Sequence, residues 1–303
     1  MAVVITTCTN RKRKPIDEGF CASSLARGSV GEVARQWGRQ LREDVPRYSA
    51  MDVYGGRSFQ DAIEAAKALN ANLFVVSAGL GLIDAENHIP AYACTVSKGA
   101  PDSISVRIGG SHRKADWWRE LQRISPYALP FRAAAGVDDT PILVSLSDNY
   151  IEMVAAEVMA LPIGRFARLR LFTRTPMSRI PEGLRGNVMP YDDRLDGPDS
   201  SIRGTRSDFA ARALRHFVGL RISGSPSEDA AAVEAALADW RMPSKFDRIR
   251  RDDTELLDLM RQHWAAAGGS SSKLLRFFRD DLGVACEQGR FAALARQVRE
   301  ERA

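Results

Sequence analysis

Short apolar runs that end abruptly in polar or glycine-containing turns recur along the first two thirds of the chain. Runs of this kind, rich in β-branched and aromatic residues, are typical of buried strands in a parallel sheet. Four of them predict strands, at residues 1–7 (MAVVITT), 73–77 (LFVVS), 141–147 (PILVSLS) and 167–173 (ARLRLFT). The last run alternates apolar and basic positions, which indicates a place nearer the edge of the sheet.

Helical periodicity occupies the intervals between these strands. Ser29 and Glu32 have the spacing of a capping box and open an amphipathic helix that is expected to end near Leu41. Further helices are expected at about residues 58–69, 149–160 and 207–218. Because strands alternate with helices, the sequence predicts an α/β fold with a layered, mostly parallel sheet.

The rest of the chain contains two long irregular segments and, near its end, a change from alternating strands and helices to helices alone. An insertion at about residues 93–140 and a loop at residues 175–205 are of a length that is often functional. Residues 223–227 (SGSPS) have the composition of a linker, after which the pattern is wholly helical, at about 228–240, 254–267, 271–281 and from 287. We therefore expect an α/β domain at residues 1–222 and a helical, DNA-binding domain at residues 228–303.

Composition narrows the function classes only slightly. The 43 Lys and Arg residues against 38 Asp and Glu give a net charge of +5, a modest argument for nucleic acid. The four cysteines form no CxxC pair and do not cluster with the histidines, so neither a disulfide framework, a metal site nor a cofactor is expected. No apolar run approaches the roughly 20 residues that span a bilayer, and the apolar-first start is unlike a signal peptide. The expectation is a cytoplasmic protein without a membrane partner.

The loop after the first strand carries the first candidate chemistry, since ligands of open parallel sheets bind beyond the carboxyl ends of the strands. Asn10 could orient a water or hydrogen-bond a base edge, or it could be an Asx-turn residue that satisfies local backbone groups. Arg11, Lys12 and Arg13 could follow a phosphate backbone or simply be solvated. Cys8 is either a nucleophile or a small buried residue.

The loop after the second strand adds a second group of candidates. Ser77, Gly79 and Gly81 could present backbone N–H groups to a phosphate or a base, although the glycine pattern is neither a Walker loop nor a dinucleotide fingerprint. Asp84 could serve as a carboxylate base. Tyr92 could stack on an extruded base or be an ordinary packing residue.

The remaining candidates lie later in the chain. Asp148 follows the third strand and either contacts substrate or caps a helix, and Tyr191 lies in the long loop, where it could close over a substrate. Three cations at i, i+3 and i+6 are expected on one flank of a helix that follows a glycine turn, which suits either a helix-turn-helix docking surface or a solvated helix face; they are Lys273, Arg276 and Arg279.

Four segments within roughly the first 95 residues together resemble a known group of proteins. They are residues 8–12 (CTNRK), 48–59 (YSAMDVYGGRSF), 75–84 (VVSAGLGLID) and 89–92 (IPAY). In these segments the chain resembles bacterial and phage domains of the uracil-DNA-glycosylase-like superfamily, including the module beside the transglycosylase domain of archaeosine synthase and antiphage DNA glycosylases. No Gly-x-Asp-Pro-Tyr follows the first strand and no His-Pro-Ser follows a late one, so uracil is not the expected substrate.

The resemblance implies a three-layer sandwich with a site at the carboxyl ends of the strands. It also implies a DNA glycosylase that hydrolyses the N-glycosidic bond of a modified base, such as a hypermodified phage base, leaving an abasic site in antiviral defence. Asn10 would position the water, with Asp84 as the competing choice, and the backbone amides near Ser77 would contact the leaving base. Modified duplex DNA would be the partner. The alternatives are a non-catalytic nucleic-acid-binding module that recognises modified bases, and a nucleoside or nucleotide N-glycosyl hydrolase or transferase.

Overall fold

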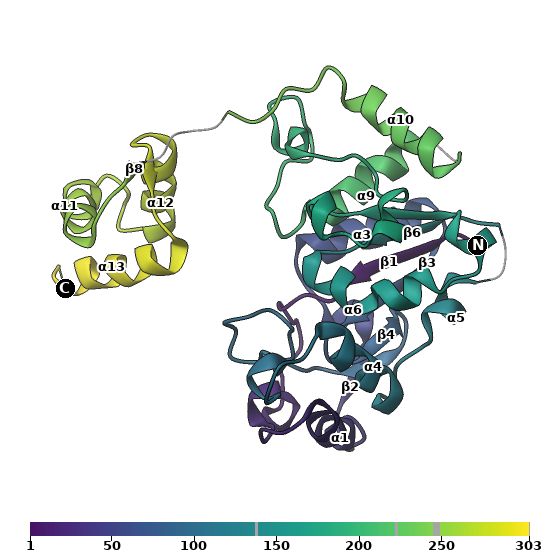
Figure 1. The fold of residues 1–303 in the computed structure, drawn as a ribbon. Coiled ribbons are helices and arrows are strands. Elements are labelled where there is room, and N and C mark those ends of the chain that lie inside the picture. The colour runs from purple at the N-terminus through teal and green to yellow at the C-terminus, as the bar shows by residue number, and fades with distance from the viewer. Residues whose placement is uncertain (137–138, 222–223, 245–248, 303) are drawn as a thin grey trace. The chain divides into compact units, whose positions relative to one another are not determined.

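A five-stranded sheet lies at the centre of the larger part of the chain (Figure 1). The computed structural model describes residues 1–136, 139–221, 224–244 and 249–302. The sheet has the strand order β4-β3-β1-β6-β7, formed by β1 (Val3–Thr7), β3 (Asn72–Ser77), β4 (Gly81–Asp84), β6 (Ile142–Ser145) and β7 (Leu169–Phe172). The four strands expected from the apolar runs are therefore confirmed, and they pair in parallel.

The fifth strand, β4, was not expected, because its residues read as a glycine loop. It pairs antiparallel with β3, so that Gly81 lies opposite Ser77 and Asp84 lies opposite Phe74. Gly81 has φ +85°, a left-handed conformation that glycine adopts without a steric penalty, and it begins the return strand. β4 therefore runs back toward the amino end of β3, where Asp84 lies.

Helices cover both faces of the sheet, consistent with a three-layer sandwich (Figure 1). α3 (Arg57–Ala68) and α9 (Phe209–Leu220) pack together on one face, while α4 (Lys114–Ile124) and α6 (Asp148–Met159) pack together on the other. α1 (Val30–Gln40) packs against α4. The structure thus confirms an α/β fold with a mostly parallel sheet.

Local sequence accounts for α1 in particular. Ser29 and Glu32 form the expected capping box, which satisfies two backbone N–H groups at the start of the helix. Val33 and Trp37, four positions apart and so on the same face, are fully buried. Burial of this face fixes α1 over the rest of the domain.

Short elements complete the larger unit. They are β2 (Arg47–Ser49), which pairs with β5 (His88–Pro90), the helices α2 (Ala50–Val53), α5 (Phe131–Ala135), α7 (Ile163–Phe166), α8 (Glu182–Arg185) and α10 (Pro226–Leu237), and the 3-10 helices η1 (Glu18–Phe20), η2 (Ala22–Ser24), η3 (Ile104–Val106), η4 (Met177–Arg179) and η5 (Asp193–Asp196).

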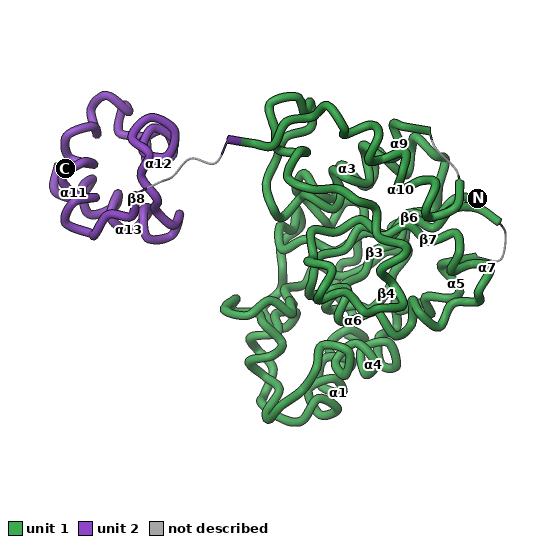
Figure 2. Tube along the Cα trace, turned by 45° about the horizontal axis from the view of Figure 1, so that its top comes forward, with its two compact units in different colours: residues 1–243 green, residues 244–303 purple. Residues whose placement is uncertain are grey.

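The boundary between the two units differs from the sequence-based expectation. The chain divides into residues 1–243 and 244–303 (Figure 2), rather than at residues 222–228. The boundary differs because of α10, which was expected to be the first helix of the second domain. Its Val233 and Leu237 are fully buried in the core of the larger unit, and Ser225, expected in a linker, caps the helix. Residues 222 and 223 of the predicted boundary and linker lie outside the described residues.

The smaller unit has a hydrophobic core of its own. It contains α11 (Asp253–His263), α12 (Ser271–Asp280) and α13 (Gln288–Glu300), and its core is centred on Phe278 and Phe291. The unit is not wholly helical, because β8 (Ile249–Arg250) and β9 (Val284–Ala285) pair in parallel. In the described parts of the chain, no helix is both long and apolar enough to cross a membrane.

Candidate functional site

The carboxyl ends of the four parallel strands meet on one side of the sheet, called here the carboxyl end of the sheet. The loop after β1 runs alongside the segment that leads into α3: the N–H of Arg13 donates to the carbonyl of Val53 (2.9 Å), and the N–H of Gly55 donates to the carbonyl of Arg11 (2.9 Å). α3 therefore begins at the carboxyl end of the sheet, next to the basic loop.

Arg11 and Arg13 project from this loop into solvent. Both are exposed, as is Asn10 beside them. A Cβ atom at Gly55 would lie 3.1 Å from Cγ of Arg13 and 3.4 Å from Cγ of Arg11, so the stems of the two arginines pass close to this glycine. Within the described parts of the chain, neither guanidinium makes a hydrogen bond or an ion pair, which leaves both free for an anionic ligand.

The amino terminus of α3 lies open beside these two arginines. Its N-cap, Gly56, has φ +98° and provides no side-chain cap, and no atom lies within 4 Å of the position a Cβ would occupy. The first N–H groups of a helix have no partner inside the helix, and the helix dipole makes this end attractive to anions. Two free guanidinium groups and an uncapped helix terminus thus occupy the same region.

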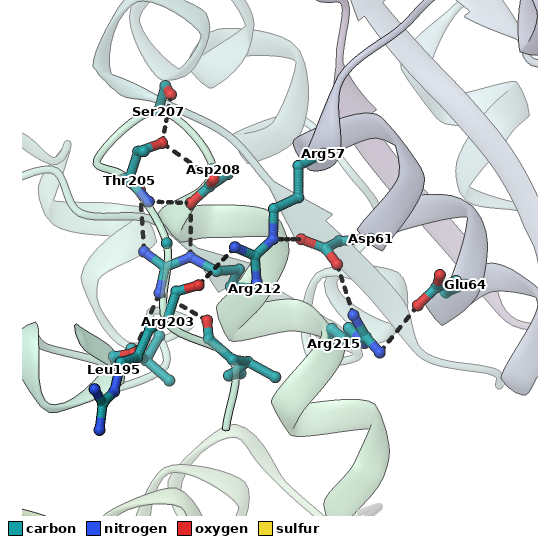
Figure 3. Close-up of polar contacts among 12 residues, drawn as sticks. Arg57, Asp61, Glu64, Leu195, Arg203, Thr205, Ser207, Asp208, Arg212 and Arg215 are labelled. Carbon is teal, nitrogen blue, oxygen red and sulfur yellow. Dashed lines mark hydrogen bonds and ion pairs between the residues drawn. The ribbon is translucent and has the colours of Figure 1, made fainter. Parts of the chain in front are cut away.

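A segment of the long loop is fixed to the start of α3 (Figure 3). Arg57 donates through Nη1 to the carbonyl of Arg203 (2.6 Å) and pairs with Asp61. Residues 202–205 of this loop are also held by Arg212 of α9, which is fully buried and donates to the carbonyls of Ile202 and Thr205. The long loop, expected to be functional, is therefore ordered against the carboxyl end of the sheet.

Lys12 differs from the arginines on either side of it. Its ammonium lies 4.7 Å from the centroid of the Tyr92 ring and 5.1 Å from that of Tyr54, and it donates to the carbonyl of Thr9. The side chain is half-buried. Burial lowers the pKa of Lys12 below its usual value, against a smaller opposite effect of Cys8 and Cys94. Lys12 thus points into the domain, and the expectation that it contacts phosphate alongside its neighbours does not fit this position.

Buried hydroxyl groups form a chain beneath Lys12. The Tyr92 hydroxyl is hydrogen-bonded to Oγ of Ser77 and, at 2.9 Å, to the hydroxyl of Tyr54. All three side chains are fully buried. Burial raises the pKa of Tyr54 and that of Tyr92, so both phenols are neutral at physiological pH. Tyr92 is therefore not exposed for stacking on an extruded base, and packing, the other reading of this residue, describes its position.

The glycine turn after β3 is packed internally instead of lying open. Oγ of Ser77 accepts the N–H groups of Gly79 (3.2 Å) and Leu80 (2.9 Å), and the carbonyl of Gly79 accepts from Nε1 of Trp37 (2.6 Å). A Cβ at Gly79 would lie 2.6 Å from Cε2 of Tyr92, so a glycine is needed here for close packing against the ring. The expected cradle for a phosphate or base at Ser77, Gly79 and Gly81 is not present in this arrangement.

Two carboxylates expected at the site occupy different places. Asp84 lies three residues along β4 from the turn, about 10 Å from it at the usual rise of a strand, toward the amino end of β3. Asp84 therefore lies away from the carboxyl end of the sheet and does not share a site with Asn10. Asp148 does lie at the carboxyl end, where it accepts from Oγ1 of Thr175 and pairs with Nη1 of Arg179 at 2.7 Å.

Tyr191 is directed into the domain. Only 8% of it is exposed, and its hydroxyl is hydrogen-bonded to Nδ1 of His216 on α9 at 2.9 Å. Its ring also packs against that of Phe172 at the end of β7. The structure therefore gives Tyr191 a packing role and does not place it over a substrate.

Cys8, expected to be either a nucleophile or a small buried residue, is buried, and sequence reasoning missed the tyrosine beside it. Cys8 is 7% exposed, and its Sγ lies 3.1 Å from the hydroxyl of Tyr150. Tyr54 and Tyr150 were not among the expected site residues. Tyr54 falls inside the segment that carries the family resemblance, which could have marked it, whereas nothing local links Tyr150 to Cys8, 142 positions away.

In the smaller unit, two of the three expected cations are free. Lys273 and Arg276 are exposed on α12, and in the described parts of the chain their side chains have no hydrogen-bond or ion-pair partner. Arg279 donates to the carbonyl of Cys286 (3.0 Å). Arg276 and Arg279 both line a surface hollow of about 470 Å³ between α12 and α13. The expected helix is confirmed, and its use as a docking surface stays a prediction.

No group of three or more His, Cys, Asp or Glu side chains suited to a metal ion occurs among the described residues. The comparisons with known proteins add no identity: no protein-family model, curated protein or solved structure matches this chain.

Proposed function

We propose that this protein acts on nucleic acid at the carboxyl end of the sheet. The observation that carries the proposal is the free pair Arg11 and Arg13 beside the uncapped amino terminus of α3. Guanidinium groups bind phosphate through paired hydrogen bonds, and helix termini bind phosphate through free N–H groups. A polyanion fits both features at once.

The smaller unit supports the same partner independently. Lys273 and Arg276 lie one helical turn apart on α12 and have no acidic partner among the described residues, whereas other arginines of this unit, such as Arg261 and Arg290, are paired with carboxylates. Free cations on one helix flank favour contact with a phosphate backbone. Two basic surfaces on one chain would strengthen binding through a higher effective concentration.

The reaction we propose is hydrolysis of an N-glycosidic bond in DNA that carries a modified base, such as a hypermodified phage base, in antiviral defence. Asn10 is exposed in the loop that follows the central strand, next to Arg11 and two residues from the half-buried Lys12. Its amide could hold the attacking water while the bond to the base breaks through an oxocarbenium-like sugar. The base would have to leave the helical stack to reach this position.

Perturbed ionisable groups favour catalysis over simple binding. Lys12, in the loop of Asn10, lies over the rings of the buried Tyr54 and Tyr92, and burial shifts the pKa of each of the three groups. Ionisable groups with shifted pKa values cluster at active sites. A non-catalytic module that recognises modified bases would need the arginines but not this cluster.

The test is incubation of the full chain with a panel of genomic DNAs, from unmodified to hypermodified phage DNA, followed by alkali and gel electrophoresis. We expect alkali-labile sites in one modified DNA, lost in Asn10→Ala and retained in Asn72→Ala, which alters an exposed asparagine at the amino end of β3. No cleavage of any DNA, with DNA binding retained, would contradict the reaction and leave the binding module. Turnover of free nucleotides instead, unchanged when residues 244–303 are deleted, would indicate a nucleoside enzyme.

A further inference from the structure

The surroundings of Lys12 are unusual for a lysine. Its amino group faces two aromatic rings and two thiols, those of Tyr54, Tyr92, Cys8 and Cys94, with no carboxylate among the groups that perturb it. A lysine on a protein surface is normally fully hydrated and charged. Desolvation without an acidic partner instead favours the neutral amine, which is the nucleophilic form.

The position of this amine matters as much as its surroundings. Lys12 follows the central strand by five residues and is two residues from Asn10, at the carboxyl end of the sheet. Arg11 and Arg13, the free arginines, are its immediate neighbours. A nucleic acid strand held by those arginines would pass next to Lys12, which is only half-buried and so keeps part of its surface exposed to solvent.

We propose that Lys12 is a nucleophile that forms an imine with the sugar of an abasic site. The inference deepens the proposed function and rests on it, because it places DNA at the carboxyl end of the sheet. It adds a second chemical step, cleavage of the strand, to removal of the base.

The step balances without an oxidant or a reductant. The lone pair of the neutral Nζ adds to the C1′ aldehyde carbon of the open-chain deoxyribose, and a proton passes from nitrogen to oxygen. Loss of water from this carbinolamine gives the imine. The C2′ proton then passes to water while the C3′–O bond breaks and expels the phosphate. Hydrolysis of the remaining imine restores the amine.

Other lysines near this region lack the combination. Lys14 is part-exposed, with its ammonium 5.0 Å from the Tyr48 ring, and Lys98 is exposed. Lys12, by contrast, lies over the rings of two fully buried tyrosines, Tyr54 and Tyr92. Lys14 is thus the matched control for Lys12, being two residues away with the same side chain.

The experiment uses the full chain and a synthetic duplex in which one abasic site has already been made, so that base removal by this protein is not required. Sodium borohydride is added during incubation, since its hydride reduces an imine to a stable secondary amine. Cross-linked protein is detected on a denaturing gel, and the modified lysine is identified by mass spectrometry of its peptides. Binding of the same duplex is measured in parallel by gel shift.

We expect a cross-link at Lys12 in the wild-type protein and in Lys14→Arg, and its loss in Lys12→Arg, which keeps a cation over the tyrosine rings but has no nucleophilic amine. Peptide mapping of the wild type answers the question even if Lys12→Arg folds poorly. A duplex that is bound but not cross-linked, or a cross-link at another lysine, overturns the inference and leaves nucleic-acid binding intact. A duplex that is not bound overturns the proposed function along with it.

The pH dependence of cross-linking is a second readout. The groups that face Lys12 are the thiols of Cys8 and Cys94 and the phenols of Tyr54 and Tyr92, and burial raises the pKa of Cys94 and of both phenols, which keeps them neutral. The yield should therefore rise with pH and level off below 10.5, the ordinary pKa of lysine. A yield that still rises through 10.5 would indicate an ordinary, solvated lysine.

Discussion

Replacement of Arg212 by methionine tests how the long loop is held at the carboxyl end of the sheet. Arg212 is fully buried on α9 and pairs with Asp208 (2.6 Å) and Asp196 (2.8 Å). It also donates to the carbonyls of Leu195, Ile202 and Thr205, so that one side chain holds the loop at three points (Figure 3). Methionine fills part of the space but supplies none of these donors.

The expected loss is large because the partners stay buried. Asp208 is only 6% exposed, and among the described residues its carboxylate would keep only the hydrogen bonds from Thr205. Removing one member of a buried ion pair costs about 3–5 kcal/mol. For a unit of this size, 1 kcal/mol corresponds to about 2–4 °C in melting temperature, so the larger unit should melt about 6–20 °C lower.

Calorimetry of the full chain would measure the melting temperature, and limited trypsin digestion would report on the loop itself. We expect faster cleavage after Arg203 and Arg206, since both lie in the segment that Arg212 holds. Arg206→Met is the matched control for the melting temperature, because this arginine is exposed and its side chain has no partner in the described parts of the chain; its effect on stability should stay within about 0.5 kcal/mol. A loss below about 1 kcal/mol in Arg212→Met, with unchanged digestion, would refute the reasoning, since such a value is typical of an exposed ion pair.

Two further predictions concern packing and pH. Gly79→Ala places a Cβ 2.6 Å from Cε2 of Tyr92 and should lower the free energy of unfolding by about 1–3 kcal/mol in urea titrations. Gly164→Ala is the control and should not lower it, because no atom lies within 4 Å of the Cβ position there. Equal effects of the two substitutions would contradict the packing argument. Burial lowers the pKa of His216 below 6.5 in the folded protein, so the unfolded chain binds the proton more readily. Stability due to His216 is thus present above pH 6.5 and is lost as pH falls through the folded pKa. The advantage of wild type over His216→Phe in urea titrations should shrink over that range, and an advantage that is constant with pH would show that burial does not perturb His216.

The sheet was largely predictable from the sequence because its signals are local. The runs at residues 1–7 and 73–77 contain β1 and most of β3, since a buried strand needs nothing but a short apolar run between turns. β4 was missed for a physical reason: a strand of four residues that begins at a glycine has no periodicity to detect, and only its pairing with β3 defines it.

The candidate site was predictable in place but not in detail. The loop of Asn10 lies at the carboxyl end of the sheet, as the position of a polar segment after a strand predicts. Which side chains point outward could not be read from sequence, because Tyr92 and Lys12 are turned inward by partners far along the chain. Tyr54 and Tyr92 are 38 positions apart, and their hydrogen bond is a product of tertiary packing alone.

The domain boundary shows the same limit. Residues 223–227 have the composition of a linker, yet Asp229, just beyond them, is buried and accepts from Nε of Arg170 on β7. This long-range ion pair attaches α10 to the larger unit. Local composition cannot report such a contact.

The most direct test of the central claim, that the carboxyl end of the sheet binds nucleic acid, is the salt dependence of DNA binding by the double variant Arg11→Gln, Arg13→Gln. Each lost phosphate contact should reduce the slope of log K against log salt by about 0.9, or about 1.8 for the pair. The same change at Arg35 and Arg39, exposed on α1, is the control and should leave the slope unaltered. A slope and an affinity equal to those of the wild-type protein would contradict the account.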